Sequence, residues 1–146
     1  MKETYTIEEI AVMSMLSTRT IRHYLSIGLL EGEKRDGVWR FTPEQYGAFL
    51  DQDMVRQSMK AKANGMLYDF LLQEKKQEED VCAIIDLPIS DLATEAHFRT
   101  TLMEQINTLG LRCSYRYEMK SAAARLILRG TPEQIAHFFD VLQKMR

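Results

Sequence analysis

The segment from Thr6 to Thr42 constrains this chain more than any other part of its sequence. It reads TIEEIAVMSMLSTRTIRHYLSIGLL and continues as EGEKRDGVWRFT. The spacing of its apolar residues predicts two short amphipathic helices that meet at a tight turn, followed by a basic hairpin. A chain with this order can lay its second helix in a DNA groove and grip the flanking backbone with the hairpin. The segment therefore predicts a winged helix-turn-helix.

Local start and stop signals support the same boundaries. Thr6 and Glu9 stand three residues apart before an apolar run, which is the spacing of a capping box. Ser17 is a suitable N-cap for the second helix, and Gly28 suits the position just past its end. Asp36-Gly37 is the dipeptide that a two-residue hairpin turn favours.

These residues resemble the MerR family of winged-helix transcription regulators. The matching pieces are TIEEIA, then STRTIRHY with its trailing IGLL, and GVWRFT at the end of the hairpin. The resemblance covers about the first third of the chain and rests on the order and spacing of several pieces. It implies that the second helix reads DNA while the hairpin, the wing, holds the backbone.

The family motif maps phosphate contacts onto Arg22 and Tyr24, with base contacts around Arg19. The complete predicted set of DNA-binding residues is Thr18, Arg19, Thr20, Arg22, His23, Tyr24, Lys34, Arg35 and Arg40. The alternative for Arg22 is a salt bridge within the domain, and the alternative for Tyr24 is a half-buried core ring. Trp39 is expected to pack the wing against the body of the domain.

The segment also departs from the family pattern. The turn between the helices reads Ser14-Met15-Leu16 where the family usually carries a glycine, and His23 replaces the first of two aromatic residues. Glu31-Gly32 replaces a proline-containing start of the wing. None of these changes removes a phosphate-binding cation, so they bear on base preference.

Composition limits the remaining classes of function. The 146 residues carry a net charge of −2, which is not the footprint of a generally basic nucleic-acid binder, so the attraction to DNA would be local. The length favours two small domains over one. The sequence shows no signal-peptide pattern and no apolar run of transmembrane length, which favours a cytoplasmic location and no membrane partner.

The sequence offers no pattern for catalysis, a cofactor or a metal. Cys82 and Cys113 are far apart and lack a ligand-pair spacing, so buried small hydrophobes are preferred over metal or redox roles. The histidines are scattered, and there is no glycine-rich phosphate loop or nucleophile elbow. We therefore predict no enzyme activity, no cofactor and no metal site.

The middle of the chain, from about Pro43 to Lys76, reads as helix with a break near Asn64-Gly65. A capped helix start at Thr42-Pro43-Glu44-Gln45 precedes it. An apolar stripe follows at helical spacing, comprising Met59, Ala63, Met66, Leu67 and Phe70. Two alternatives remain for this stripe: it covers the core of its own chain, or it pairs across a homodimer. A charged boundary then runs from Gln73 to Asp80.

The last part of the chain predicts the order strand, helix, strand, strand, helix. Residues 81–85 form a continuous apolar run that predicts a buried strand, and residues 93–109 form a helix stopped by Gly110. Residues 111–119 alternate as a half-exposed strand, with a hairpin partner over 122–128. This order resembles a ferredoxin-like split β-α-β unit without its last strand. The first strand would then have an exposed apolar edge, which predicts a homodimer.

A basic face accompanies the alternating strand and its partner. It comprises Arg112, Arg116, Lys120, Arg125 and Arg129. This face could bind an acidic effector or a phosphate, but a solvated sheet face is the preferred interpretation.

The sequence as a whole predicts an α+β chain. A helical winged helix-turn-helix with a small β-hairpin (residues 1–57) is joined by a connecting or dimerisation helix (58–80) to a β-α-β-β-α domain (81–146) that serves dimerisation or effector binding. We expect a homodimeric, sequence-specific DNA-binding transcriptional regulator with double-stranded DNA as partner, and leave open an unknown small-molecule effector. The alternative is a dimeric protein-interaction adaptor with a degenerate helix-turn-helix.

Overall fold

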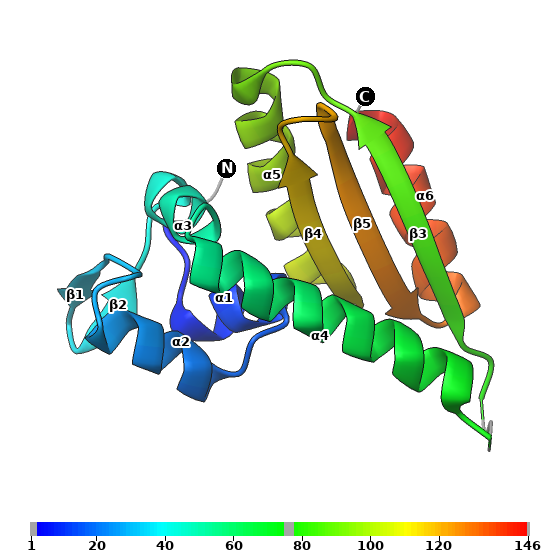
Figure 1. Cartoon of the computed structure of the whole chain (residues 1–146), viewed down its shortest axis with the longest axis horizontal. Coiled ribbons are helices and arrows are strands. Elements are labelled where there is room, and N and C mark those ends of the chain that lie inside the picture. Colours follow the sequence, from blue (N-terminus) through cyan, green and yellow to red (C-terminus); the bar gives the residue numbers. More distant parts are fainter. Residues whose placement is uncertain (1–2, 75–77, 146) are drawn as a thin grey trace.

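The computed structural model describes residues 3–74 and 78–145. Helices dominate the first half and an antiparallel sheet the second, which confirms the predicted α+β class (Figure 1). The elements are α1 (Ile7–Ser14), α2 (Thr18–Ser26), β1 (Glu33–Arg35), β2 (Val38–Arg40), α3 (Pro43–Leu50), α4 (Asp53–Leu72), β3 (Val81–Pro88), α5 (Leu92–Leu109), β4 (Arg112–Glu118), β5 (Ala123–Gly130) and α6 (Pro132–Met145).

The predicted capping devices are confirmed in the first half. The Glu9 amide donates to Thr6 Oγ1 at 3.2 Å, and the Thr6 amide donates to Glu9 Oε1 at 3.1 Å. Ser17 caps α2 by accepting from the Thr20 amide at 3.1 Å. Asp36-Gly37 turns the β1–β2 hairpin with φ values of 50° and 79°, as a type I′ turn requires.

One aromatic-rich core holds the N-terminal elements together. Tyr5 and Phe41 form a two-way backbone bridge, with N–O distances of 2.7 and 2.9 Å, which ties the start of the chain to the end of the hairpin. Met59 of α4 and Met103 of α5 belong to the same core, so it extends into the later elements. Its other fully buried members include Ile10, Met13, Ile21, Leu30, Tyr46 and Phe49.

The predicted helix break near Asn64-Gly65 is wrong. The helical segment breaks instead at Asp51-Gln52, between α3 and α4, and α4 runs unbroken through Gly65 to Leu72. A glycine inside a helix costs only about 1 kcal/mol, and burial of the neighbouring Met66 and Ala63 offsets that cost. The expected helix end at Lys76 lies outside the described residues.

The apolar stripe of α4 is used within its own chain. Met59 packs in the N-terminal core, while Ala63 and Met66 pack against Ile127 of β5. These three residues therefore cover the core of their own chain, as the first of the two alternatives predicts, while Leu67 and Phe70 remain half-buried. α4 thus spans from the helix-turn-helix to the sheet and contacts both.

The sheet has the strand order β3-β5-β4, antiparallel throughout. α5 and α6 cover one face, and α4 crosses part of the other face (Figure 1). The order matches a split β-α-β unit whose fourth strand, beside β3, is missing from the described part of the chain. The core between the sheet and α5–α6 is apolar and includes Leu102, Ile106, Cys113, Leu126, Leu128 and Phe138.

Two expectations for the sheet need correction. β3 is not a buried strand, because it lies at the sheet edge and leaves Ile84 52% exposed. The face of β4 that was expected to be solvated is partly covered, since α1 and α4 both contact β4 and Ser114 is only 6% exposed. The pattern of apolar residues in one strand predicts that strand alone. It does not show which neighbouring element covers each face of the sheet.

Candidate DNA interface

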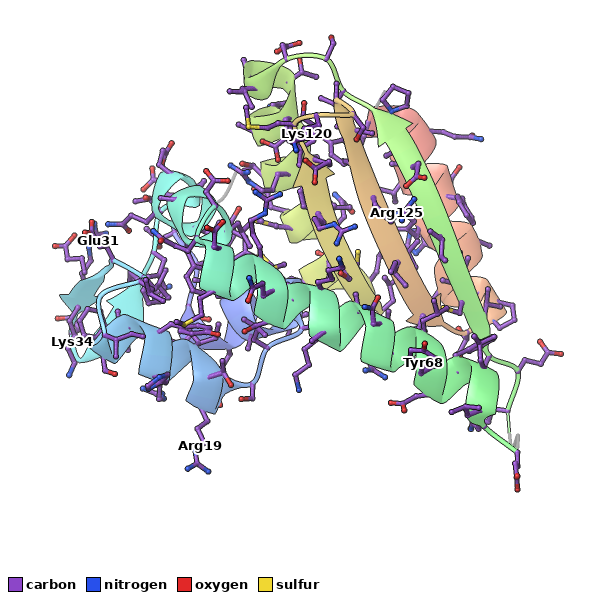
Figure 2. All side chains as sticks on the ribbon, in the orientation of Figure 1. Arg19, Glu31, Lys34, Tyr68, Lys120 and Arg125 are labelled. Carbon is purple, nitrogen blue, oxygen red and sulfur yellow. The ribbon has the colours of Figure 1, made fainter. Side chains whose placement is uncertain are left out.

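Helix α2 presents one polar face that the rest of the chain leaves free. Thr18, Arg19, Arg22 and His23 are exposed along it, whereas Ile21 on the opposite face is fully buried. Arg19 and Arg22 stand three residues apart, so their side chains share a face. Figure 2 shows Arg19 extending from α2 away from the body of the chain.

The charges on this face are not neutralised locally. Within residues 3–74 and 78–145, neither Arg19 nor Arg22 forms an ion pair, so the predicted alternative of an internal salt bridge for Arg22 is not seen. Thr20 is half-buried, and its hydroxyl lies 2.9 Å from Ser17 Oγ at the start of α2. The helix therefore offers two free guanidinium groups flanked by hydroxyl and imidazole groups.

The β1–β2 hairpin adds a second group of cations. Lys34, labelled in Figure 2, and Arg35 are exposed. The Lys34 Nζ lies 5.9 Å from the centre of the Trp39 ring. Arg35 is paired with Glu33 at 3.0 Å, but both side chains are more than half exposed, so water screens the pair. Arg40 is half-buried on β2.

Packing against Phe41 holds the hairpin in place. Trp39 stacks on Phe41 with ring centres 6.4 Å apart and an interplanar angle of 14°, so Trp39 packs the hairpin on the core as expected. At Gly32, where the hairpin begins, an added Cβ would overlap the Phe41 ring and lie 2.9 Å from the Arg40 carbonyl oxygen. Only glycine fits there without displacing the buried ring.

Tyr24 differs from the other predicted contact residues because its side chain is only 5% exposed. Its ring packs 5.8 Å from Phe49, and its hydroxyl lies 2.6 Å from Ser58 Oγ of α4. The structure thus shows the core-ring alternative for Tyr24. Sequence reasoning missed Ser58, because no local pattern links two residues 34 positions apart.

The turn between α1 and α2 explains one departure from the family pattern. Met15 caps α1 with φ 63°, in the left-handed region where glycine is least strained. Ser14 supports the turn, since its Oγ donates to the Ile10 carbonyl at 2.8 Å and accepts from the Leu16 amide at 3.2 Å. The conformation expected of a glycine is therefore kept without one.

Other kinds of site find little support among the described residues. No three His, Cys, Asp or Glu side chains in this part of the chain are grouped so that they could hold a metal ion. Burial raises the pKa of both thiols, Cys82 and Cys113, which disfavours the reactive thiolate. No described helix is both long enough and apolar enough to cross a membrane.

A helix-turn-helix with free cations on its second helix, followed by a basic hairpin, defines the class of helix-turn-helix DNA-binding proteins. Residues 5–49 match the family described as MerR HTH family regulatory protein. The N-terminal region is therefore a MerR-family helix-turn-helix domain, the DNA-binding part of a class of transcription regulators. No curated protein and no solved structure matches the chain.

Proposed function

We propose that this chain is a sequence-specific DNA-binding transcriptional regulator that acts as a homodimer and responds to a ligand. The observation that carries the proposal is the pair of exposed, unneutralised guanidinium groups of Arg19 and Arg22 on one face of α2. In this scheme α2 lies in the major groove, with Arg22 on a phosphate and Arg19, Thr18 and His23 at base edges.

The hairpin cations extend the same surface. Lys34, Arg35 and Arg40 hold the flanking backbone, and the stacking of Trp39 on the buried Phe41 ring holds the hairpin against the core. Tyr24 acts as a positioning residue, since its hydroxyl is engaged by Ser58 inside the chain. Phosphate contacts give affinity and register, and base contacts give specificity.

We assign three parts to the chain within this function. Residues 1–57 read DNA, residues 58–80 connect or dimerise, and residues 81–146 contribute to dimerisation or effector binding. The free edge of β3 supports the dimer, because it leaves backbone groups and Ile84 uncovered and a second β3 would pair with it. A two-fold dimer presents two α2 helices to two half-sites.

Fluorescence-anisotropy titration over a salt series tests the proposal. The duplexes are DNA from the chain's own upstream region and a scrambled sequence of the same length. The expected result is tighter binding to the upstream duplex. Arg22→Ala should flatten the slope of log affinity against log salt by about 0.9 per lost contact, hence by about 1.8 for a dimer that loses two.

Two further variants distinguish base contacts from phosphate contacts and from the loss of an unrelated arginine. Arg19→Ala should reduce the preference for the upstream duplex more than it flattens the salt slope, because Arg19 is assigned to base edges. Arg112 is an exposed arginine on β4, so Arg112→Ala is the matched control. It should leave the preference for the upstream duplex and the salt slope unchanged. Weak binding that is equal for both duplexes and insensitive to Arg22→Ala would overturn the proposal and favour the adaptor.

A further inference from the structure

A groove of about 820 Å³ lies between the long helix α4 and the edge strand β4, and continues to the start of α5. In Figure 1, α4 crosses the lower part of the sheet and leaves the upper part of the same face without a helix over it. Its volume falls within the roughly 300–1,000 Å³ of small-molecule sites. The DNA-binding surface on α2 and the hairpin is separate from it.

Cations outnumber carboxylates along this groove. Asp51 and Glu95 line it, against a cationic set that comprises Arg56, Lys60, Arg99, Arg116 and Arg125. Most carboxylates near the groove already have a partner. Glu95 accepts from Arg99 at 3.0 and 3.1 Å and from the Tyr115 hydroxyl at 2.8 Å.

Two more arginines that line the groove have a carboxylate partner. Arg125 makes a bidentate contact with Asp86 at 2.7 and 2.9 Å, and Arg56 lies 3.7 Å from Glu118. The sheet register explains why Arg116 has no such partner. Arg116 is the cross-strand neighbour of Arg125, whose own neighbour on the far side is Asp86. The carboxylate of Asp86 is therefore the one acidic group in a row of three residues aligned across the strands, beside the guanidinium groups of Arg125 and Arg116.

Lys60 and Arg116 are the cations that remain. Across the part of the chain that the structure describes, neither forms an ion pair. Both line the groove, Lys60 from α4 and Arg116 from β4. Two unneutralised cations that line one concave surface favour an anionic ligand.

The rest of the lining is suited to an apolar body. Met59 and Ala63 of α4, Tyr117 of β4 and Ile127 of β5 contribute carbon surface beside the two cations. Leu92 at the mouth is 58% exposed. A ligand that fills the groove would cover these side chains and place its charged end between Lys60 and Arg116.

We propose that this groove binds a small organic anion, an apolar or aromatic body that carries a carboxylate or a similar acidic group. The inference deepens the proposed function by locating its effector site, and as a regulatory site it rests on that function. α4 supplies the connection: Lys60 follows Ser58, which contacts Tyr24 of α2, and Met59, which packs in the helix-turn-helix core. A ligand held by Lys60 therefore acts on the segment that braces α2.

The test uses probes that share one shape and differ in charge. These are 1-naphthoate, neutral 1-naphthalenemethanol and cationic 1-naphthylmethylammonium, titrated into the full chain without DNA by calorimetry. The expected result is saturable binding of 1-naphthoate, at least about fivefold tighter than the neutral compound, with the cation weakest. Non-saturable binding, or equal affinity for all three probes, would overturn the proposal.

Paired variants locate the bound anion. Lys60→Gln and Arg116→Gln should each weaken 1-naphthoate about fivefold and leave the affinity for the neutral probe unchanged. Lys62→Gln on α4 and Arg112→Gln on β4 are matched controls, because both residues are exposed and neither lines the groove. Equal weakening by the controls would place the anion elsewhere and contradict the assignment.

The two proposals can fail separately. Specific DNA binding without any anion preference would remove the groove proposal and leave the DNA-binding function standing. Anion binding that depends on Lys60 and Arg116, without specific DNA binding, would overturn the proposed regulator function and leave the anion site standing.

Discussion

The hydroxyl groups of Tyr24 and Ser58 lie 2.6 Å apart and join α2 to α4. The Tyr24 ring also packs against Phe49 of α3, so α2 is braced by both of the helices that follow the hairpin. This one side chain thus sets the position of the helix that we propose to read DNA. It also links that helix to the wall of the groove.

The hydrogen bond between these residues should appear as a coupling energy. Tyr24→Phe and Ser58→Ala are each expected to lower the free energy of unfolding by about 1 kcal/mol, because each leaves the other hydroxyl without its partner. The double variant should cost little more than either single change, as measured by urea unfolding. Ser26→Ala is the control, since its hydroxyl bonds the His23 carbonyl at 2.6 Å and should add independently to Tyr24→Phe. Additive costs for Tyr24 and Ser58 would show that the bond is absent in solution.

The same variant tests the assignment of Tyr24 as a positioning residue. Because its ring is buried, Tyr24→Phe should leave the salt dependence of DNA binding unchanged, although the affinity itself falls. Anisotropy titrations of this variant beside Arg22→Ala make the comparison direct. A slope as flat as that of Arg22→Ala would instead make the hydroxyl a phosphate ligand.

Much of the N-terminal region could be predicted from its sequence because its signals are local. The Thr6–Glu9 box, the Ser17 cap and the Asp36-Gly37 turn each depend on residues within three positions. Exposure of Arg19 followed from the buried position of Ile21 in the same short helix. The brace to Ser58 and the fit of Gly32 against Phe41 depend on tertiary packing, so no window of sequence contained them.

The second half shows where pattern reasoning stops. The alternation along β4 predicted a strand, but Ser114 is buried on the face that was expected to be solvated, because α1 and α4 both contact β4. Gly65 suggested a helix break that burial of Met66 overrides. The basic residues of the sheet were visible as a set, whereas only the register shows that Asp86 is taken by Arg125 and leaves Arg116 unpaired.

The proposed dimer predicts a response at the free edge of β3. Ile84→Lys should convert a dimer of about 34 kDa into monomers of 17.0 kDa, because a lysine on an edge strand disfavours pairing with another strand. Sedimentation equilibrium measures the mass. The exposed position of Ile84 means that the monomer itself should remain folded.

A matched surface change provides the control for this experiment. Val12→Lys, on the exposed side of α1, replaces a similarly exposed aliphatic residue and should not alter the mass. A wild-type chain that sediments as a monomer at micromolar concentration would contradict the dimer. A dimer that survives Ile84→Lys would place the interface elsewhere.

Tyr5 predicts a stabilising substitution. Its side chain is fully buried, and its hydroxyl finds no hydrogen-bond partner among the described residues. An unsatisfied buried hydroxyl costs about 1–3 kcal/mol, so Tyr5→Phe should raise the free energy of unfolding by about 1 kcal/mol at pH 7. Tyr68→Phe, on the exposed side of α4, should change nothing. A loss of stability in Tyr5→Phe would mean that the hydroxyl has a partner.

The titration of the Tyr5 phenol predicts how the stability of wild type and of Tyr5→Phe should differ with pH. Burial, followed by repulsion from Glu104 and Glu9, raises the pKa of Tyr5 from 10.0 to about 12. Between pH 10 and 12 the unfolded chain releases this proton and the folded chain keeps it, so Tyr5 lowers stability by about 1.4 kcal/mol per pH unit. Tyr5→Phe should therefore lose stability less steeply than wild type in this window, as measured by urea unfolding. Parallel curves would contradict the burial of the phenol.

The Arg99 side chain packs against Gly47 of α3. This contact predicts how one added methyl group at Gly47 changes the stability of the chain. An added Cβ on Gly47 would lie 2.5 Å from Arg99 Nη2, whose guanidinium is held by the nearly buried Glu95. Gly47→Ala should therefore displace the guanidinium and weaken the only ion pair that Glu95 makes among the described residues. Gly65→Ala in α4 meets no atom within 4 Å and should stabilise the chain by about 0.5–1 kcal/mol, the ordinary gain for alanine in a helix.

We predict a difference in the free energy of unfolding between Gly47→Ala and Gly65→Ala. Gly47→Ala should be less stable than Gly65→Ala by at least about 1 kcal/mol in urea unfolding, since a disturbed buried ion pair costs more than the helix gains. In an Arg99→Met background the guanidinium is gone, so the cost of Gly47→Ala should disappear. Because Glu95 and Arg99 also line the groove, Gly47→Ala should shift 1-naphthoate affinity as well, while Gly65→Ala should not. Equal effects of the two alanines in the wild-type background would show that α3 and α5 are not in contact at this point.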